Sequence, residues 1–540
     1  MALSNFIQLF SGLAMFLYGM SLMGDGLQKA AGKKMKDIIS FFTRNRLLAV
    51  IVGCIVTGII QSSSATTVMV VGFVNANLMT LSQAIGIIMG ANIGTTVTAQ
   101  LVSFDIEAIA PFAIAVGVLI MFLKKGKQAQ NLSQILIGFG ILFVGMVFMK
   151  ESVIPLREYD GFKNLLVKFG NNPFLGILIG FLLTLVLQSS SASIGILLAL
   201  ASQGLMPLSS ALPILYGDNI GTCTTAIISS LTSTGPNAKR AAVMHLIFNV
   251  IGTLIFAFVL NHPIQWAVVE MNPDSVTRQI ANAHTLFNLI NVILQFPFAE
   301  YIVKLACKII PDDNSKDNVY ATFASHLDER MLLTPGIALQ NAINECILMG
   351  EMAKFSSENA IKAFTLKSQE HINETFKTEE MINEREKLLA DFLLKLSNKE
   401  ISAYDRIIVE NLLNVVKNIE RIGDHAENIA ELAQTNIDDR LDYSRDALED
   451  INLMFTKVMA SLDLALEARR DSDFSKLRSV EITEDQVDII EKVARSGHID
   501  RLNRKKCDSE SGIMFLDLFS NLERISDHAL NIAKSILYEK

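Results

Sequence analysis

Two short polar motifs recur inside apolar parts of this 540-residue chain. The string Gln-Ser-Ser-Ser-Ala starts at Gln61 and again at Gln188, and Gly-x-Asn-Ile-Gly-Thr surrounds Asn92 and again Asn219. Each motif returns after 127 residues, and the step from Gln to Asn is 31 residues in both copies. Identical spacing in two intervals indicates an internal duplication.

The residue types of these motifs suit an anion that binds together with cations. Serine hydroxyls and the free backbone N–H groups of broken helices are hydrogen-bond donors for an oxyanion such as phosphate. Hydroxyl, Asn and Gln oxygens are hard ligands of the kind that sodium takes. Neither motif contains Lys or Arg, so bound cations have to balance the charge of the anion, which favours symport.

A serine-rich segment often means only close helix packing, because serine lets helices approach and forms bonds across their interface. Because both motifs recur with the same 127-residue offset, a binding site is the better interpretation. Asp218 stands where the first copy has Ala91. An acidic group at membrane depth is usually functional, so Asp218 is a candidate cation ligand, with a structural pairing to a nearby donor as the alternative. The candidate substrate and sodium ligands are Gln61, Ser62, Ser63, Ser64, Asn92, Thr95, Gln188, Ser189, Ser190, Ser191, Asp218, Asn219 and Thr222.

A second duplication lies near the C-terminus. The string that starts at Glu420, Glu-Arg-Ile-Gly-Asp-His-Ala, returns after 103 residues at Glu523 as Glu-Arg-Ile-Ser-Asp-His-Ala. Glu and Asp four residues apart share one helix face, where both carboxylates can reach a hard cation. The candidate metal ligands are Glu420, Asp424, Glu523 and Asp527, and a solvated face with ordinary Glu–Arg pairs is the alternative.

The two duplications lie in parts of the chain that differ in their content of charged residues. Half of the residues are hydrophobic and 19% are charged. The first 310 residues hold 18 basic and 11 acidic side chains, a net charge of +7, whereas the remaining 230 hold 29 and 44, a net charge of −15. This partition predicts a lipid-embedded part followed by a water-exposed part.

Seven apolar stretches are long enough to cross about 30 Å of hydrocarbon, namely 6–23, 81–102, 108–123, 131–149, 207–232, 241–262 and 279–304. The segments 47–77 and 173–205 are each interrupted by Gln-Ser-Ser-Ser, which is costly if it faces lipid. We therefore expect re-entrant helical hairpins whose polar tips are buried in protein.

The positions of Lys and Arg predict the orientation. The connections 24–46, 124–130 and 233–240 hold eleven basic residues, and the alternate connections 103–107, 150–172 and 263–277 hold four. The positive-inside bias places the first set, and the C-terminal part, in the cytoplasm. The two copies of the repeat then have opposite orientations, which is the architecture of alternating-access transporters.

Beyond a polar linker at 311–324, apolar residues recur at spacings of three and four, as at Ile408, Leu412, Val416, Ile419 and Ile422. Proline is absent after Pro335. Residues 325–540 are therefore predicted to form a helical bundle. The expected fold is all-α: a polytopic membrane protein with two inverted repeats, followed by this bundle.

Through its paired motifs, the chain resembles the type II sodium/phosphate cotransporter family over residues 1–310. The strings His245-x-x-Phe248-Asn249 and His284-x-x-Phe287-Asn288 also look like helix motifs of that family. The resemblance implies repeats at about 6–123 and 131–262, an extra helix at 279–304, and phosphate and sodium sites at the candidate ligands given above. It also implies a location in the plasma (inner) membrane.

The C-terminal part resembles PhoU domains through its duplicated motif. That resemblance implies a cytoplasmic regulatory domain whose Glu420, Asp424, Glu523 and Asp527 bind a multivalent metal of unknown identity. The expected function is therefore sodium-dependent transport of inorganic phosphate under the control of this domain.

Two alternatives stay open: phosphate export, and a membrane-anchored phosphate or metal sensor that does not transport. An enzyme is not expected, because the sequence has no nucleophile–base pattern and no nucleotide-binding loop. The expected partners are phosphate and lipid, with a homo-oligomer or phosphate-signalling proteins as further candidates, and no nucleic acid.

Overall fold

The computed structural model describes residues 3–42, 45–76, 78–104, 106–158, 172–231, 236–311, 327–399, 401–471, 473–504, 507 and 509–539. In these ranges the chain is helical and contains no strand, which confirms the all-α prediction. It divides into two compact units, Met1–Lys316 and Asp317–Lys540. The predicted linker 311–324 lies outside the described residues, apart from its first position.

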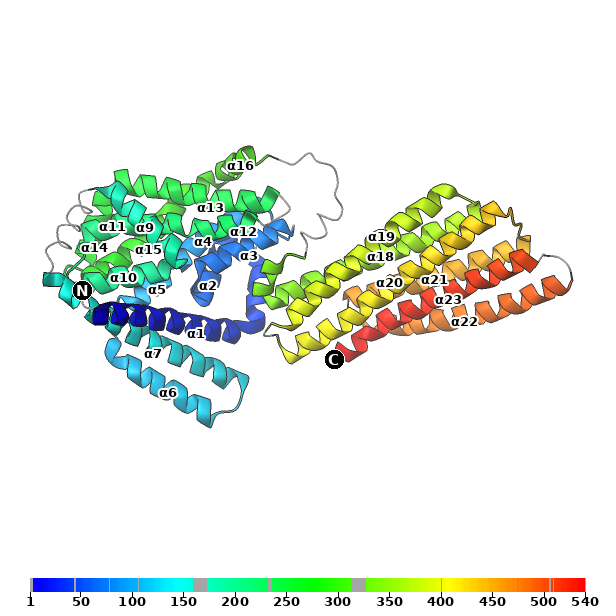
Figure 1. Ribbon diagram of the computed structural model, residues 1–540, viewed down its shortest axis with the longest axis horizontal. Coiled ribbons are helices and arrows are strands. Elements are labelled where there is room, and N and C mark those ends of the chain that lie inside the picture. The colour runs from blue at the N-terminus through cyan, green and yellow to red at the C-terminus, as the bar shows by residue number, and fades with distance from the viewer. Residues whose placement is uncertain are drawn as a thin grey trace. The chain divides into compact units, whose positions relative to one another are not determined.

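The first unit contains fifteen α-helices in its described part (Figure 1). They are α1 (Leu3–Phe42), α2 (Arg46–Ile60), α3 (Ser63–Asn75), α4 (Leu81–Gly94), α5 (Thr96–Val102), α6 (Ala110–Leu123), α7 (Lys127–Val153), α9 (Pro173–Leu187), α10 (Ser190–Ser202), α11 (Leu208–Gly221), α12 (Cys223–Leu231), α13 (Pro236–Ile255), α14 (Asn261–Met271), α15 (Val276–Gln295) and, after a short 3-10 turn that ends α15, α16 (Ala299–Ile309).

The sequence duplication is reproduced in the helix boundaries. Helices α2, α3 and α4 begin and end 127 residues before α9, α10 and α11. The cap before each first helix repeats as well, because Asn45 and Asn172 accept hydrogen bonds from backbone N–H groups of the first turn. Asparagine is a favoured N-cap because its side-chain oxygen satisfies a donor that the helix leaves free.

Glycines set the close packing within each copy. A Cβ atom at any of four glycines in α2, α4, α9 and α11 would overlap a backbone carbonyl oxygen of the facing helix. The facing pairs are Gly53 with Ile87, Gly90 with Val50, Gly180 with Ile214 and Gly217 with Ile177. The first Gly of each Gly-x-Asn-Ile-Gly-Thr motif is therefore a packing residue, which lets α2 contact α4 and α9 contact α11 backbone to backbone.

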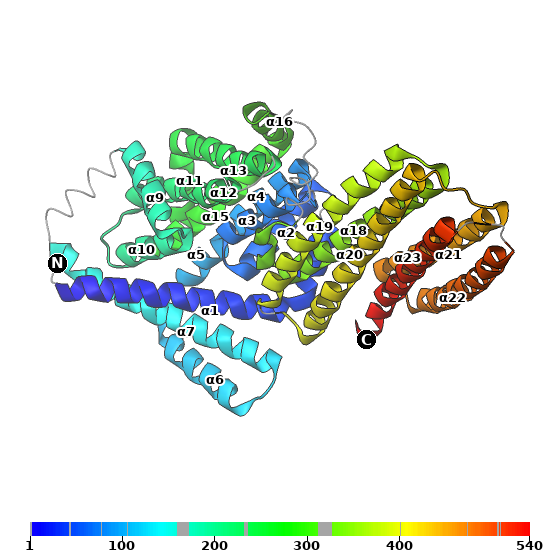
Figure 2. The same ribbon diagram turned by 45° about the vertical axis from the view of Figure 1, so that its right-hand side comes forward.

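The long helices α1 and α7 lie side by side and antiparallel (Figures 1 and 2). Gly12 packs on the backbone at Gly145, and Gly19 packs on the backbone at Gly138, so partners run in opposite directions along the two helices. Small residues at such contacts let helix backbones approach closely, as in other membrane helix pairs. Residues of α7 lie 127 positions after residues of α1, so equivalent helices of the two copies face each other.

Five helical segments in the described part of the chain are long and apolar enough to cross a membrane: Leu3–Ala31, Leu81–Val102, Lys127–Leu156, Pro236–Met271 and Val276–Ile309. Five of the seven predicted stretches overlap these segments, and two do not. The predicted 108–123 segment is part of a shorter apolar helix, Glu107–Leu123. The predicted 207–232 segment is not among the five; it consists of α11 and α12, which meet at Thr222 as α4 and α5 meet at Thr95.

The interrupted segments consist of short helices. Helices α2 and α9 have 15 residues each, so each is about 22 Å long and falls short of the hydrocarbon thickness. Helix α1 continues through most of the predicted basic connection 24–46 and ends at Phe42. Ala, Lys and Met are good helix formers, and they are frequent in this stretch.

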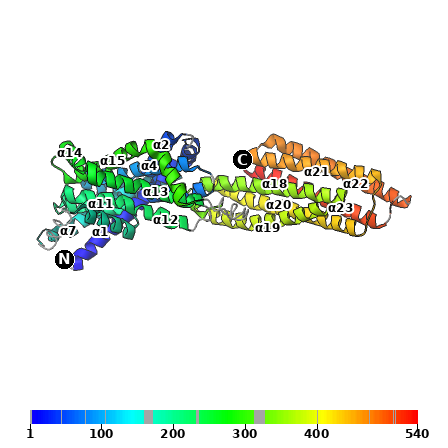
Figure 3. The same ribbon diagram turned by 90° about the horizontal axis from the view of Figure 1, so that it is seen from above.

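In its described part, the second unit is a bundle of six long helices, which lie side by side when seen from above (Figure 3). They are α18 (Pro335–Leu366), α19 (Gln369–Ser397), α20 (Ala403–Asp438), α21 (Arg445–Asp471), α22 (Phe474–Asn503) and α23 (Ser509–Lys534). Helices α18–α20 pack on one another, as do α21–α23, and α20 contacts α23. The bundle thus consists of two three-helix halves that follow the 103-residue sequence repeat.

Candidate functional site

The Gln-Ser-Ser-Ser motifs break the helix at a left-handed glutamine. Gln61 ends α2 with φ 59° and Gln188 ends α9 with φ 52°. A non-glycine residue rarely adopts this conformation. In both copies the Gln side-chain amide donates to the carbonyl oxygen three residues earlier, at Gly58 and Leu185. A sparsely populated backbone conformation kept at both positions is typical of a site that needs its geometry fixed.

The first serine of each motif starts the next helix. The Ser62 hydroxyl oxygen accepts from Ala65 N–H at 3.1 Å, and the Ser189 oxygen accepts from Ala192 N–H at 3.2 Å. The backbone N–H groups of Ser63 and Ser190, the first residues of α3 and α10, have no partner among the described residues. Each motif therefore presents free N–H groups at the positive end of a helix dipole.

The two copies differ in exposure. Ser63, Ser190 and Ser191 are buried, whereas Ser62, Ser64 and Ser189 are partly exposed. Gln61 is buried and its side-chain oxygen accepts a hydrogen bond from Thr98 at 2.8 Å, but Gln188 is exposed. The duplicated sequence thus forms two tips with the same backbone and different surroundings.

The motif asparagines bond to later helices that lie outside the four motifs. Asn92 donates to Asn249 on α13 at 2.6 Å, and Asn219 donates to Asn288 on α15 at 3.5 Å. Each acceptor also donates to the carbonyl of the histidine one turn earlier, His245 or His284. All four asparagines are buried. The His-x-x-Phe-Asn strings therefore hold the Gly-x-Asn-Ile-Gly-Thr motifs.

Thr95 and Thr222 lie at the breaks between α4 and α5 and between α11 and α12, and both are buried. The copies exchange partners beyond these breaks, since α5 packs on α10 and α12 packs on α3. Each serine-led helix thus contacts the helix that follows the threonine of the other copy. Within the described residues, no hydrogen bond joins one Gln-Ser-Ser-Ser segment directly to the other.

Asp218 is buried beside two hydroxyl groups that the sequence analysis missed. Its Oδ1 accepts from Thr184 at 2.9 Å and from Ser193 at 2.7 Å. The corresponding residues of the first copy, Thr57 and Thr66, bond to each other at 2.9 Å. The 127-residue offset could have found them, because Thr57 and Thr184 occupy the same repeat position, as do Thr66 and Ser193.

The predicted metal ligands of the bundle lie on α20 and α23 beside other acids. Glu420 pairs with Lys417 at 2.9 Å, and Asp424 pairs with Arg421 at 3.1 Å. Burial, followed by the charge of Glu420, raises the pKa of Asp424. In the described part of the chain, no group of three or more His, Cys, Asp or Glu residues is arranged to hold a metal ion.

The second acidic pair resembles the first in its electrostatics. Burial raises the pKa of both Glu523 and Asp527, and the neighbouring Asp488 on α22 raises it further in each case. Close acidic groups on adjacent helices repel one another unless a cation or protons offset their charge. The arrangement is compatible with a cation, although these carboxylates do not form a complete ligand set.

Symmetry within the bundle is visible between α20 and α23. The rings of His425 and His528 stack with centroids 5.6 Å apart. Each ring bonds through Nδ1 to an asparagine of the other helix at 2.9 Å, His425 to Asn521 and His528 to Asn418. The repeated motif therefore packs around a local two-fold arrangement.

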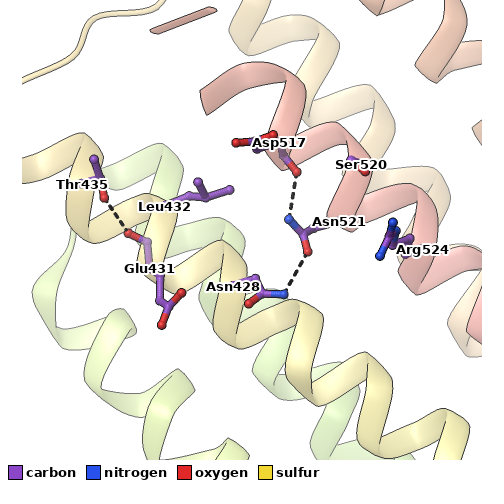
Figure 4. Close-up of a pocket in the computed structure, with 8 residues that line it drawn as sticks. All are labelled: Asn428, Glu431, Leu432, Thr435, Asp517, Ser520, Asn521 and Arg524. Carbon is purple, nitrogen blue, oxygen red and sulfur yellow. Dashed lines mark hydrogen bonds between the residues drawn. The ribbon is translucent and has the colours of Figure 1, made fainter. Parts of the chain in front are cut away.

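A pocket of about 350 Å³ opens beside this contact (Figure 4). Asn521 lies in its centre, accepts a hydrogen bond from Asn428 at 3.3 Å and donates to the Asp517 carbonyl at 2.9 Å. The remaining lining residues are Glu431, Leu432, Thr435, Ser520 and Arg524. None of the four predicted metal ligands lines it, so this pocket is separate from the acidic pairs.

Comparisons with known proteins agree with the division of the chain into two units. Residues 15–151 and 157–271 match the family model described as Na+/Pi-cotransporter, and residues 347–433 and 451–536 match the PhoU domain. The chain is 25% identical to the "Putative inorganic phosphate export protein YjbB" of Salmonella typhimurium over 98% of this chain and 97% of that protein.

Two further relatives match the first unit. The uncharacterized protein YqeW of Bacillus subtilis is 31% identical over 55% of this chain and 95% of its own length. The sodium-dependent phosphate transport protein 2A of Rattus norvegicus is 31% identical over 33% of this chain and 28% of that protein.

Proposed function

Because this chain belongs to the Na+/Pi-cotransporter family and carries a PhoU domain, we propose that it moves inorganic phosphate across a membrane together with sodium, by alternating access of two inverted repeats. The observation that carries this proposal is the pair of broken helices at Gln61 and Gln188, whose backbone conformation, capping and serine-led second helices are the same.

The proposed phosphate ligands are the free N–H groups and hydroxyls at Ser63 and Ser190. Helix N-termini bind anions through such N–H groups and through the helix dipole. Hydroxyl oxygens and the carbonyl oxygens at the breaks near Thr95 and Thr222 are proposed as sodium ligands, because broken membrane helices offer oxygen ligands of this kind. The motifs contain no Lys or Arg, so the bound sodium ions balance the negative charge of the phosphate.

The antiparallel contact of α1 with α7 supports inverted repeats, because these helices occupy equivalent places in the two copies. The exchanged contacts of α5 with α10 and of α12 with α3 support a shared site between the copies. Rocking of one copy against the other would expose such a site to either side of the membrane in turn.

Net export is a second candidate for the direction of transport. The relative named as a phosphate export protein matches this chain along nearly its whole length, including the PhoU part. The relative named as sodium-dependent matches only a third of the chain. A coupled carrier runs in the direction set by its gradients, so both directions are compatible with one site.

The test is the flux of radiolabelled phosphate in proteoliposomes that contain the purified full-length protein. We expect phosphate to accumulate when sodium is high outside and to leave when the sodium gradient is reversed. Phosphate flux that does not depend on the sodium gradient would overturn the proposed coupling to sodium. Tight phosphate binding without any flux would instead support a membrane-anchored sensor.

The PhoU domain is proposed as a cytoplasmic regulator, with a multivalent metal at Glu420, Asp424, Glu523 and Asp527. The candidate phosphate and sodium ligands all lie in the first unit, so transport chemistry does not need the second. Replacing both Asp424 and Asp527 by Asn should lower the metal content, measured by mass spectrometry, and change regulation while flux persists. Abolished flux in a well-folded variant would show that the domain takes part in transport itself.

A further inference from the structure

One buried carboxylate distinguishes the two copies of the repeat. Asp218 is 1% exposed, and its Oδ1 accepts two hydrogen bonds, from Thr184 and from Ser193. Its Oδ2 is buried and has no hydrogen-bond partner among the described residues, and no described cation forms an ion pair with it. An unpaired carboxylate oxygen is costly to keep away from water.

The first copy shows that the fold does not need this charge. There Ala91 replaces Asp218. The Thr57 hydroxyl donates to the Thr66 hydroxyl at 2.9 Å, and Thr66 donates to the Ser62 carbonyl. Helices α2, α3 and α4 nevertheless keep the boundaries of α9, α10 and α11. The carboxylate of the second copy is therefore an addition to a hairpin that already closes without it.

The chemistry of the cluster favours a monovalent cation. One positive charge cancels the single carboxylate, whereas a divalent ion would leave an excess buried charge. A proton on Oδ2 would create an O–H donor that again lacks an acceptor. The hydroxyls of Thr184 and Ser193 donate to Oδ1 and keep lone pairs on their oxygens, so carboxylate and hydroxyl oxygens can together coordinate a hard cation.

We propose that Asp218, Thr184 and Ser193 form a sodium site that only the second copy of the repeat contains. This inference rests on the proposed sodium-coupled transport and gives one coupling ion a location. The site lies next to the binding motifs, since Thr184 precedes Gln188 by one helical turn and Asp218 precedes Asn219 directly. Sodium bound there would neutralise the carboxylate and hold α9, α10 and α11 together beneath the Ser189–Ser191 tip.

The test compares the wild-type protein with Asp218→Asn and with Asp218→Ala, which restores the residue type of the first copy. Equilibrium binding of radioactive sodium to the purified full-length protein should fall by one ion per chain in both variants. Ser193→Ala should weaken sodium binding by about tenfold, as loss of a ligand or its support commonly does. The matched control is Thr57→Val in the first copy, which should leave the bound sodium unchanged.

Equal sodium binding by wild type and both monodisperse Asp218 variants would overturn the proposal. So would sodium binding that is unchanged while the pH dependence of phosphate flux disappears, because Asp218 would then carry a proton. A wild-type protein that binds no sodium at all would overturn the proposed sodium coupling together with this site. Wild-type sodium-dependent flux that Asp218→Asn retains in full would overturn only this site.

Discussion

The side chain of Asn92 donates a 2.6 Å hydrogen bond to Asn249, which lies 157 residues later in the chain. The bond joins the first copy of the repeat to α13. Its counterpart in the second copy, from Asn219 to Asn288, is 3.5 Å long. In each copy an Asn–Asn hydrogen bond therefore holds the motif against another helix, and the shorter bond of the first copy is the stronger one.

This difference predicts unequal effects of removing the two acceptors. Asn249→Ala leaves a buried amide donor of Asn92 without its partner, which costs about 1–3 kcal/mol. We expect a corresponding loss of phosphate affinity or of stability, measured by binding and thermal unfolding of the purified protein. Asn288→Ala is the matched control and should cost less. A larger loss in Asn288→Ala would contradict this assignment of strengths.

The serines at the helix starts should contribute directly to anion binding. Ser63→Ala or Ser190→Ala should each weaken phosphate binding by about 1–3 kcal/mol through a lost buried hydrogen bond, as measured by isothermal titration in saturating sodium. Ser133→Ala is a suitable control, because the buried Ser133 hydroxyl donates to the Gly117 carbonyl between α7 and α6, outside the motifs. Unchanged affinity in both motif variants would remove the proposed phosphate site.

Glycine packing can be tested within one helix. The Cβ of Gly53→Ala would overlap the Ile87 carbonyl oxygen, whereas the Cβ of Gly58→Ala would make an ordinary 3.7 Å contact with Val97. Overpacking of this kind costs about 1–3 kcal/mol. Gly53→Ala should therefore lower the thermal unfolding temperature and the yield of folded protein clearly more than Gly58→Ala. Equal unfolding temperatures would show that α2 and α4 can separate freely.

The proposed orientation can be tested with single cysteines in a background without the five native ones. Gly126→Cys, in the connection before α7, should react with an impermeant maleimide only from the cytoplasmic side. Asp274→Cys, in the connection before α15, should react only from the outside. Labelling of both positions from the same side would rule out the proposed orientation.

His498 predicts a pH dependence of stability in the bundle. It is buried against Phe515 at 4.9 Å, and neither ring nitrogen has a hydrogen-bond partner among the described residues. Burial, followed by the charge of Arg501, lowers the pKa of His498. Arg501 itself pairs with Asp450 at 3.0 Å. The folded bundle therefore prefers the neutral ring.

A folded-state pKa below that of the unfolded chain makes stability fall as the pH drops below about 6.5. Hydrogen exchange of the α22 amides in the full-length protein should thus quicken between pH 7 and pH 5, after correction for intrinsic exchange. His498→Gln should flatten this dependence, whereas His371→Gln, at a partly exposed position on α19, should not. An unchanged slope in His498→Gln would show that other groups cause the acid sensitivity.

The sequence alone determined the class of the protein and the positions of its duplicated motifs. Spacing along the chain reveals a duplication directly, and the structure reproduces the 127-residue repeat in its helix boundaries and the 103-residue repeat in the two halves of the bundle. Long apolar runs and a change in charge are also local properties, and they separate the membrane part from the bundle.

The tertiary structure decided which groups meet. Asn249, Thr184 and Ser193 are far from their partners in sequence or lie outside the motifs, so only packing shows that they contact Asn92 and Asp218. The same holds for Gln61 and Gln188, where identical sequence gives one buried and one exposed glutamine. Periodicity predicts a helix and its apolar face, but the hydrogen bonds of a buried polar group depend on helices that fold against it from elsewhere in the chain.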